Sequence, residues 1–132
     1  MPSLRTRLIT KFSTIIFILA GFLFSQNVAF AAIVRGASTT CSNNGATTIA
    51  CTLTAPTNGD ALIAVIGTRG TSIGRVSSVT QTGATWVRAA QVANANGTTS
   101  EIWYALNISG ASTGVTINLA ASIKASAVIV EY

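Results

Sequence analysis

The chain has 132 residues, of which eight are basic, three are acidic and none is histidine. This length accommodates one domain rather than two. Without histidine, the Ser–His and Cys–His nucleophile arrangements are excluded. Three scattered acidic residues also argue against a calcium site, which needs several clustered oxygen ligands. We therefore expect neither a metal nor another cofactor.

The N-terminus has the three-part organisation of a secretory signal peptide. A basic region precedes the apolar run 12–24 and the A-x-A site Ala29-Phe30-Ala31, after which cleavage is predicted. The alternative is an uncleaved membrane anchor, but the run is about 13 residues long and a bilayer needs roughly 20. We expect a signal peptide over residues 1–31, a secreted or surface-located domain over 32–132, and no membrane contact after cleavage. The basic residues of the signal are Arg5, Arg7 and Lys11.

Removal of the signal changes the charge of the protein. The formal net charge of the whole chain is +5, whereas after cleavage five basic residues face three acidic ones, which gives +2. The basic residues of the domain stand singly in the sequence and form no run, so a nucleic-acid partner is not expected. They are Arg35, Arg69, Arg75, Arg88 and Lys124.

Cys41 and Cys51 both follow the predicted cleavage site and would meet an oxidising compartment. We therefore predict that they form a disulfide, which would add roughly 2–3 kcal/mol of stability by closing a short loop. Two free thiols or a zinc site fit less well, since two thiolates without histidine do not make a zinc site. A tight turn at Asn44-Gly45 would place Cys41 opposite Thr48. The disulfide thus requires a wider loop, a bulge or a staple between sheets.

The domain is rich in β-branched residues and is divided by turn signals rich in glycine and asparagine. No segment after the signal has a helical period. Seven to eight short strands with turns at intervals of roughly 8–12 residues are typical of an antiparallel β-sandwich, jelly-roll or immunoglobulin-like fold. The predicted strands cover residues 33–40, 47–53, 61–66, 75–82, 84–92, 98–106, 115–119 and 125–132.

The strand at 98–106 contains the strongest candidates for a ligand site. Glu101 and Trp103 share one face of this strand, and Tyr104 lies on the other. We expect Tyr104 to point inward and Trp103 to be partly exposed. Trp103, Glu101 and Trp86 are then candidate ligand-binding residues, because tryptophans can form a stacking platform for sugar rings. The alternative is that both tryptophans seal the core.

The other two acidic residues have structural interpretations. Asp60 follows a turn and is expected to hold turn amides. Glu131 lies in the last apolar strand, where an outward, solvated position is expected. No motif joins these acids to Glu101 as a catalytic pair, so we do not expect an enzyme.

Several segments resemble a β-sandwich module of large exported bacterial surface and secreted proteins. Residues 58–64 resemble its G-D-x-L-I start, residues 76–86 its V-x-S-V-T…T-W hairpin, and residues 101–107 its I-W-Y-A strand. Residues 116–119 and 127–132 resemble its closing V-T-V-x-F…A-V-V-x-E-Y segment. The resemblance covers nearly all of the chain after the signal. It implies a module that lies beside other domains, and it carries over no catalytic residue.

Two departures from the pattern of this module are informative. Gln81 stands where the pattern often has aspartate, which argues against a calcium ligand there. The pattern also usually continues into Ser-Gly, whereas the sequence stops at Tyr132. The domain is therefore either truncated at its C-terminus or closed by this last strand.

These observations predict a non-catalytic secreted β-sandwich module with a structural or adhesive role at the cell exterior. The alternatives are a carbohydrate-binding module and an accessory N-terminal domain of a longer secreted enzyme. The expected partner is a surface polysaccharide or another extracellular protein.

Overall fold

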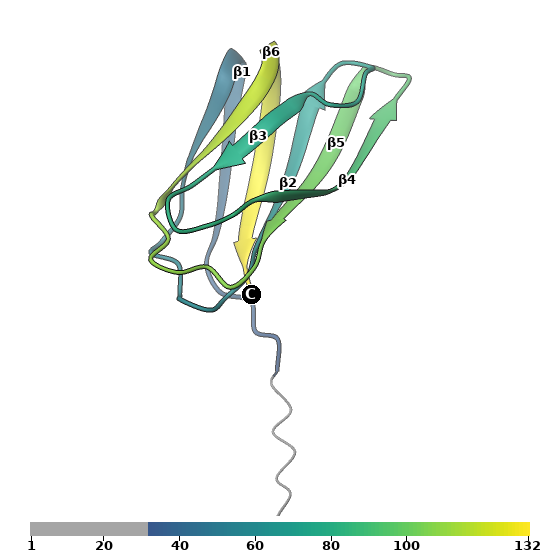
Figure 1. Cartoon of the computed structure of the whole chain (residues 1–132). Coiled ribbons are helices and arrows are strands. Elements are labelled where there is room, and N and C mark those ends of the chain that lie inside the picture. Colours follow the sequence, from purple (N-terminus) through teal and green to yellow (C-terminus); the bar gives the residue numbers. More distant parts are fainter. Residues whose placement is uncertain (1–31) are drawn as a thin grey trace, which may run out of the picture. The chain divides into compact units, whose positions relative to one another are not determined.

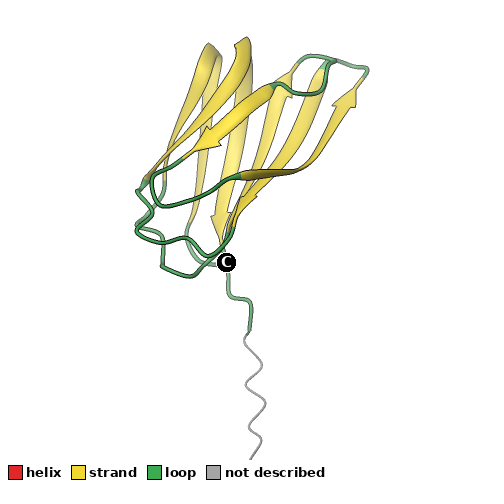
Figure 2. Cartoon of the chain, in the orientation of Figure 1, coloured by secondary structure: helices red, strands yellow, loops and turns green. Residues whose placement is uncertain are grey.

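The computed structural model describes residues 32–132, and this part of the chain contains six β-strands and no helix (Figures 1 and 2). The all-β prediction is confirmed. The predicted signal peptide lies outside the described residues. The strands are β1 (Ser38–Thr52), β2 (Leu62–Arg69), β3 (Val76–Thr80), β4 (Val87–Asn94), β5 (Thr98–Ala105) and β6 (Gly114–Glu131).

All six strands belong to one antiparallel sheet in which β6 is the central element. The strand order is β1-β6-β2-β5-β4, and β3 pairs with β6 outside this path. The C-terminal half of β6 lies between β1 and β2, whereas its N-terminal half lies between β1 and β3. Figure 1 shows β1 and β6 side by side along their length. The two long strands thus join a wide arm, which contains β2, β5 and β4, to a narrow arm, which contains β3.

Residues 32–132 contain six strands instead of the seven to eight predicted, because in two cases a pair of predicted strands is one long strand. The segments 33–40 and 47–53 form β1, and the segments 115–119 and 125–132 form β6. The turn signal at Asn44-Gly45 marks a bulge instead of a hairpin. Gly45 has a φ of 103°, and the pairing of β1 with β6 shifts register on both sides of Ala46. The bulge adds a bend without ending the strand.

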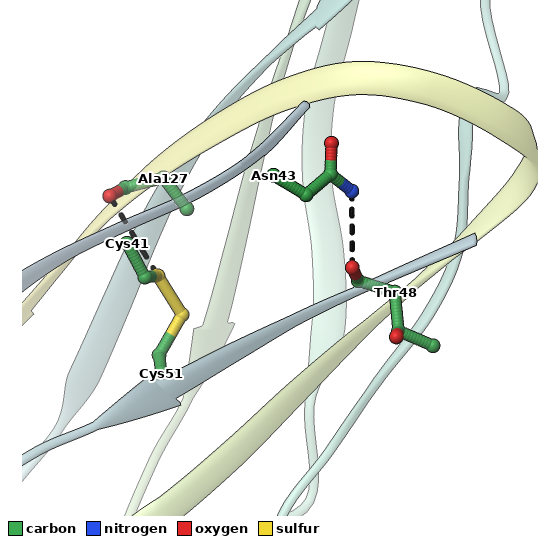
Figure 3. Close-up of a disulfide and its surroundings, with 5 residues drawn as sticks. All are labelled: Cys41, Asn43, Thr48, Cys51 and Ala127. Atoms are coloured by element: carbon green, nitrogen blue, oxygen red, sulfur yellow. Dashed lines mark hydrogen bonds between the residues drawn. A yellow bond between two sulfur atoms is a disulfide. The ribbon is translucent and has the colours of Figure 1, made fainter. Parts of the chain in front are cut away.

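The side chain of Asn43 stabilises this bulge. Its amide nitrogen donates to the carbonyl oxygens of Ala46 at 3.2 Å and Thr48 at 3.0 Å, and Figure 3 shows the contact with Thr48. Its amide oxygen accepts from the backbone nitrogens of Gly45 at 3.3 Å and Ala125 at 3.1 Å. One side chain therefore replaces the ladder hydrogen bonds that the bulge removes.

The predicted disulfide between Cys41 and Cys51 is present, with the two Cα atoms 5.3 Å apart (Figure 3). Both cysteines lie on β1, one on each side of the bulge. Cys41 is paired with Ala127 in the C-terminal half of β6, and Cys51 is paired with Val115 in its N-terminal half. Of the arrangements that the sequence left open, the structure contains the bulge, and the disulfide spans it within β1.

Alternating side chains from both arms form one core. In β2, Leu62, Ala64 and Ile66 are buried, while Val65 between them is exposed. The hydroxyl groups of Thr68 and Thr99 continue this buried face and hydrogen-bond to each other. The narrow arm and the β1–β6 pair contribute Ile49, Cys51, Val76, Val79, Val115, Ile117, Leu119, Ala127 and Ile129.

Candidate functional site

Glu101 is buried in the core, with 1% of its surface exposed. Its Oε1 accepts from the backbone nitrogen of Val76 at 2.9 Å, and its Oε2 accepts from Trp103 Nε1 at 3.2 Å. Arg88 Nε lies 2.8 Å from Oε2 and forms an ion pair with it, without the alignment of a hydrogen bond. A buried carboxylate is tolerated only with such partners. The contacts of Glu101 are thus those of a structural ion pair between β5 and β4.

The prediction that Trp103 is partly exposed is wrong. Glu101 and Trp103 do share a face, as alternation required, but that face is the buried one, and Trp103 is 7% exposed. Tyr104 is only half-buried, on the opposite face. The guanidinium of Arg88 lies 4.7 Å from the centre of the Trp103 ring, in a cation–π contact. Arg88 covers the ring surface that a stacked sugar would need.

Trp86 is also a core residue, at 9% exposure. Its Nε1 donates to Gln81 Oε1 at 3.2 Å, and Gln81 Nε2 donates to the carbonyl oxygen of Ser112 at 2.6 Å. Gln81 therefore links the tryptophan to the loop before β6. Both tryptophans therefore lie in the core, as in the alternative interpretation. Neither presents an open stacking platform.

Glu131 is buried, so the prediction of an outward, solvated position is wrong. Its Oε1 accepts from the backbone nitrogen of Thr57 at 2.5 Å, and its Oε2 accepts from that of Ala37 at 3.1 Å. The Thr57 hydrogen bond is the largest influence on the pKa of Glu131, and together with the Ala37 bond it outweighs burial and lowers this pKa. The amide of Thr57, in the turn before Asp60, is therefore bound by Glu131. The prediction had given the amides of this turn to Asp60.

The exposed surface of β6, β2 and β5 provides a different candidate site, which we call the outer face. Its centre is an apolar row of three exposed side chains in neighbouring strands, Val128, Val65 and Ile102. They are 41%, 49% and 40% exposed. Single exposed apolar residues are ordinary, whereas contiguous exposed groups are more typical of contact surfaces.

A row of serines runs beside the apolar row, two residues further along each strand and on the same face. Ser42 pairs with Ser126, Ser126 with Gly67, and Gly67 with Ser100. Because Gly67 has no side chain, the surface is hollowed there. One open hollow of about 440 Å³ extends from Gly67 toward Val65 and Val128. A second, of about 560 Å³, extends from Gly67 to the end of the sheet.

Two cations line the second hollow, Arg69 and Lys124. In the register of β2 and β6, Thr68 is opposite Ala125, so the next step places Arg69 opposite Lys124. Both side chains are exposed. They are far apart in the sequence, where each appeared as a single charge, and only strand pairing brings them together. No sequence signal indicated this pair, because both residues lie outside the predicted strands: Arg69 follows the strand 61–66, and Lys124 precedes the strand 125–132.

Two further properties concern the described residues as a set. Residues 32–132 contain no group of three or more histidine, cysteine or acidic side chains that could hold a metal ion. In the same part of the chain, no helix has the length and apolar character required to cross a membrane.

Comparison of the chain with protein-family models, with curated proteins and with solved structures found no significant match. The resemblance to an exported bacterial module therefore stays a prediction that rests on the sequence motifs.

Proposed function

We propose that the chain is a secreted, non-catalytic β-sandwich module with a structural or adhesive role at the cell exterior. The observation that carries this proposal is the outer face, where Val65, Ile102 and Val128 form an open apolar row on a covalently stapled sheet. Within the domain such a row contributes only the modest stability of cross-strand pairs, whereas a module that contacts other surfaces can also use it for binding.

The sandwich architecture is supported by the way the two arms meet. Buried side chains of the wide arm, such as Leu62, belong to the same core cluster as Val79 of the narrow arm and Ile117 of the joining strand β6. A sheet whose two arms share one core resembles two packed layers. The long strands β1 and β6 would pass from one layer to the other at the bulge.

Secretion is supported by the signal-peptide pattern of residues 1–31 and by the disulfide, which is consistent with an oxidising compartment. A non-catalytic role is supported by the use of the acidic residues. Glu101 and Glu131 are both engaged by structural partners, which leaves neither free to act as an acid or base.

The proposal is tested by weakening the apolar row without disturbing the strands. Val65→Thr, Ile102→Thr and Val128→Thr together keep β-branched side chains in all three strands. In an expressing host, we expect the processed chain to be found outside the cell with its disulfide formed. We also expect the triple variant to reduce the fraction retained on cell surfaces at least fivefold.

Ile73→Thr is the matched control, because Ile73 is an exposed apolar residue outside the strands. It should leave retention unchanged. Retention of the triple variant equal to that of the wild type would contradict the adhesive role. A chain that stays in the cytoplasm with reduced cysteines would contradict secretion.

A carbohydrate-binding role is the second candidate. The buried tryptophans do not favour it, but the hydroxyl-lined hollow over Gly67 does, because small polar groups beside an apolar surface suit a sugar.

A further inference from the structure

Gly67 is a glycine that the fold itself does not require. It lies inside β2, and its backbone is not in the left-handed region that favours glycine. A Cβ placed there would come no closer than 3.8 Å to its nearest neighbour, Ser126 Oγ, which is an ordinary contact. Glycine weakens a strand interior, and one use of a glycine that has no such internal reason is to let another molecule approach the backbone closely.

The surroundings of Gly67 are suited to hydrogen bonding with a polar ligand. Ser100 and Ser126 flank it on the neighbouring strands, and Ser42 extends the row onto β1. All three serine side chains are exposed. On the side of the first hollow, Val65 and Val128 provide an apolar surface next to these hydroxyl groups.

The cations at the other side of Gly67 lack an acidic partner on the outer face. Like charges on directly opposite strand positions are unfavourable, yet Arg69 lies opposite Lys124 in the continued register. The next residues across the sheet are Asn44, paired with Lys124, and Thr98, paired with Arg69, and both are uncharged.

The three acidic residues of the domain are placed elsewhere. Glu101 and Glu131 are buried. Asp60 precedes β2, whereas Arg69 ends it, and at about 3.3 Å per residue this strand separates the two by roughly 25 Å. An anionic ligand would therefore relieve a repulsion that no side chain of the domain relieves.

We propose that the two hollows that meet at Gly67 together bind a segment of an acidic, uronate-bearing glycan. The carboxylate lies between Arg69 and Lys124, the sugar hydroxyls meet the serine row, and the C–H surface of the ring rests against Val65 and Val128. The serine row beside an apolar surface favours a sugar acid over a bare anion. The choice of an extracellular glycan rests on the proposed function, whereas the anion site does not.

The test measures binding of the purified chain to three probes by titration calorimetry. The probes are a hexamer of galacturonate, a neutral glucose hexamer of the same length, and inorganic phosphate. We expect the acidic hexamer to bind at least tenfold more tightly than either of the others. Binding should weaken as salt is raised, because the cations are exposed and therefore screened.

Two variants locate the site. Arg69→Gln with Lys124→Gln should weaken hexagalacturonate binding at least tenfold, while Arg35→Gln, which removes another exposed cation, should leave it unchanged. Gly67→Val should abolish binding by filling the hollow. It should also keep or raise the melting temperature, since valine favours a strand and the space is open. Loss of binding in a variant that folds at least as well cannot come from unfolding.

Each remaining outcome overturns the proposal. Equal binding of phosphate and hexagalacturonate would leave an anion site without a glycan. Equal losses of affinity in Arg35→Gln and in the double variant would indicate general charge attraction. If Gly67→Val binds as tightly as the wild type, the binding site is not at Gly67. If hexagalacturonate does not bind at all, this inference fails, while export and surface retention of the chain remain measurable on their own.

Discussion

At the scale of single residues, Glu101 shows how a charge can belong to the core of a β domain. It receives a backbone hydrogen bond from Val76, an indole hydrogen bond from Trp103 and the positive charge of Arg88. Arg88 also donates through Nη2 to the carbonyl oxygen of Val76. The cluster therefore ties β5 and β4 in the wide arm to the first residue of β3 in the narrow arm.

Replacing Glu101 by glutamine tests this cluster. Glutamine keeps nearly the same shape and leaves the charge of Arg88 facing a neutral amide. We expect a loss of about 2–3 kcal/mol, below the roughly 3–5 kcal/mol of a fully buried pair, because the Arg88 side chain is 31% exposed. Urea unfolding at neutral pH measures this loss. A loss of less than about 0.5 kcal/mol, as for an exposed pair, would contradict a structural role.

Arg88→Met completes a double-mutant cycle with Glu101→Gln. If the two residues act as a pair, the double variant should lose less stability than the sum of the single losses. Additive losses would mean that the ion pair contributes little beyond the separate contacts of each side chain.

At the scale of elements, β1 is the strand on which the architecture depends. It pairs with both halves of β6, and it changes register at Gly45, where the Asn43 side chain supplies the lost hydrogen bonds. Ser122 Oγ also donates to the carbonyl oxygen of Gly45 at 2.6 Å, so β6 holds the bulge from the other side. The disulfide then joins the two halves of β1 next to the bend.

Removing the disulfide with Cys41→Ala and Cys51→Ala should lower the free energy of unfolding by roughly 2–3 kcal/mol, because the closed loop is short. The bulge should survive, since the hydrogen bonds of Asn43 do not depend on the cysteines. Urea unfolding together with far-ultraviolet circular dichroism distinguishes the two effects. Loss of the β spectrum at zero denaturant would show that the staple is needed to form the bend.

At the scale of the whole domain, Glu131 joins segments that are distant in the sequence. Its carboxylate accepts from the amide of Ala37 before β1 and from that of Thr57 between β1 and β2. Its own backbone nitrogen donates to the carbonyl oxygen of Ala37 at 2.9 Å. The end of β6 therefore closes one end of the domain through a single ionised side chain.

This closure predicts a pH dependence of stability. The pKa of Glu131 is lowered in the folded state, chiefly by the Thr57 hydrogen bond, from a usual value of 4.5. Its ionised form therefore stabilises the fold fully above pH 4.5, and this contribution is lost as pH falls through the lowered pKa. Glu131→Gln should be less stable than the wild type at neutral pH, and the difference should shrink below about pH 4. Urea unfolding from about pH 7 to about pH 3 tests this, and a difference independent of pH would contradict it.

Much of the local structure was predictable from residue patterns. The β-branched composition and turn signals predicted an all-β domain, and the two cysteines of the sequence allowed one pairing, which is present. Alternation also placed Glu101 and Trp103 on one face correctly. These features depend on neighbours in sequence or on simple counting, so they need no knowledge of which strands pair.

The remaining features depend on strand pairing, which local patterns do not encode. Glu101 looked like an outward residue because its countercharge, Arg88, arrives from a neighbouring strand. The Asn-Gly signal at Gly45 became a bulge because β6 continues past it as a partner. Arg69 and Lys124 became neighbours only when β2 paired with β6. The sequence by itself determined the class of fold and its covalent staple, and the tertiary structure decided which face is buried and where unpaired charges meet, because burial and charge pairing are set by contacts between strands.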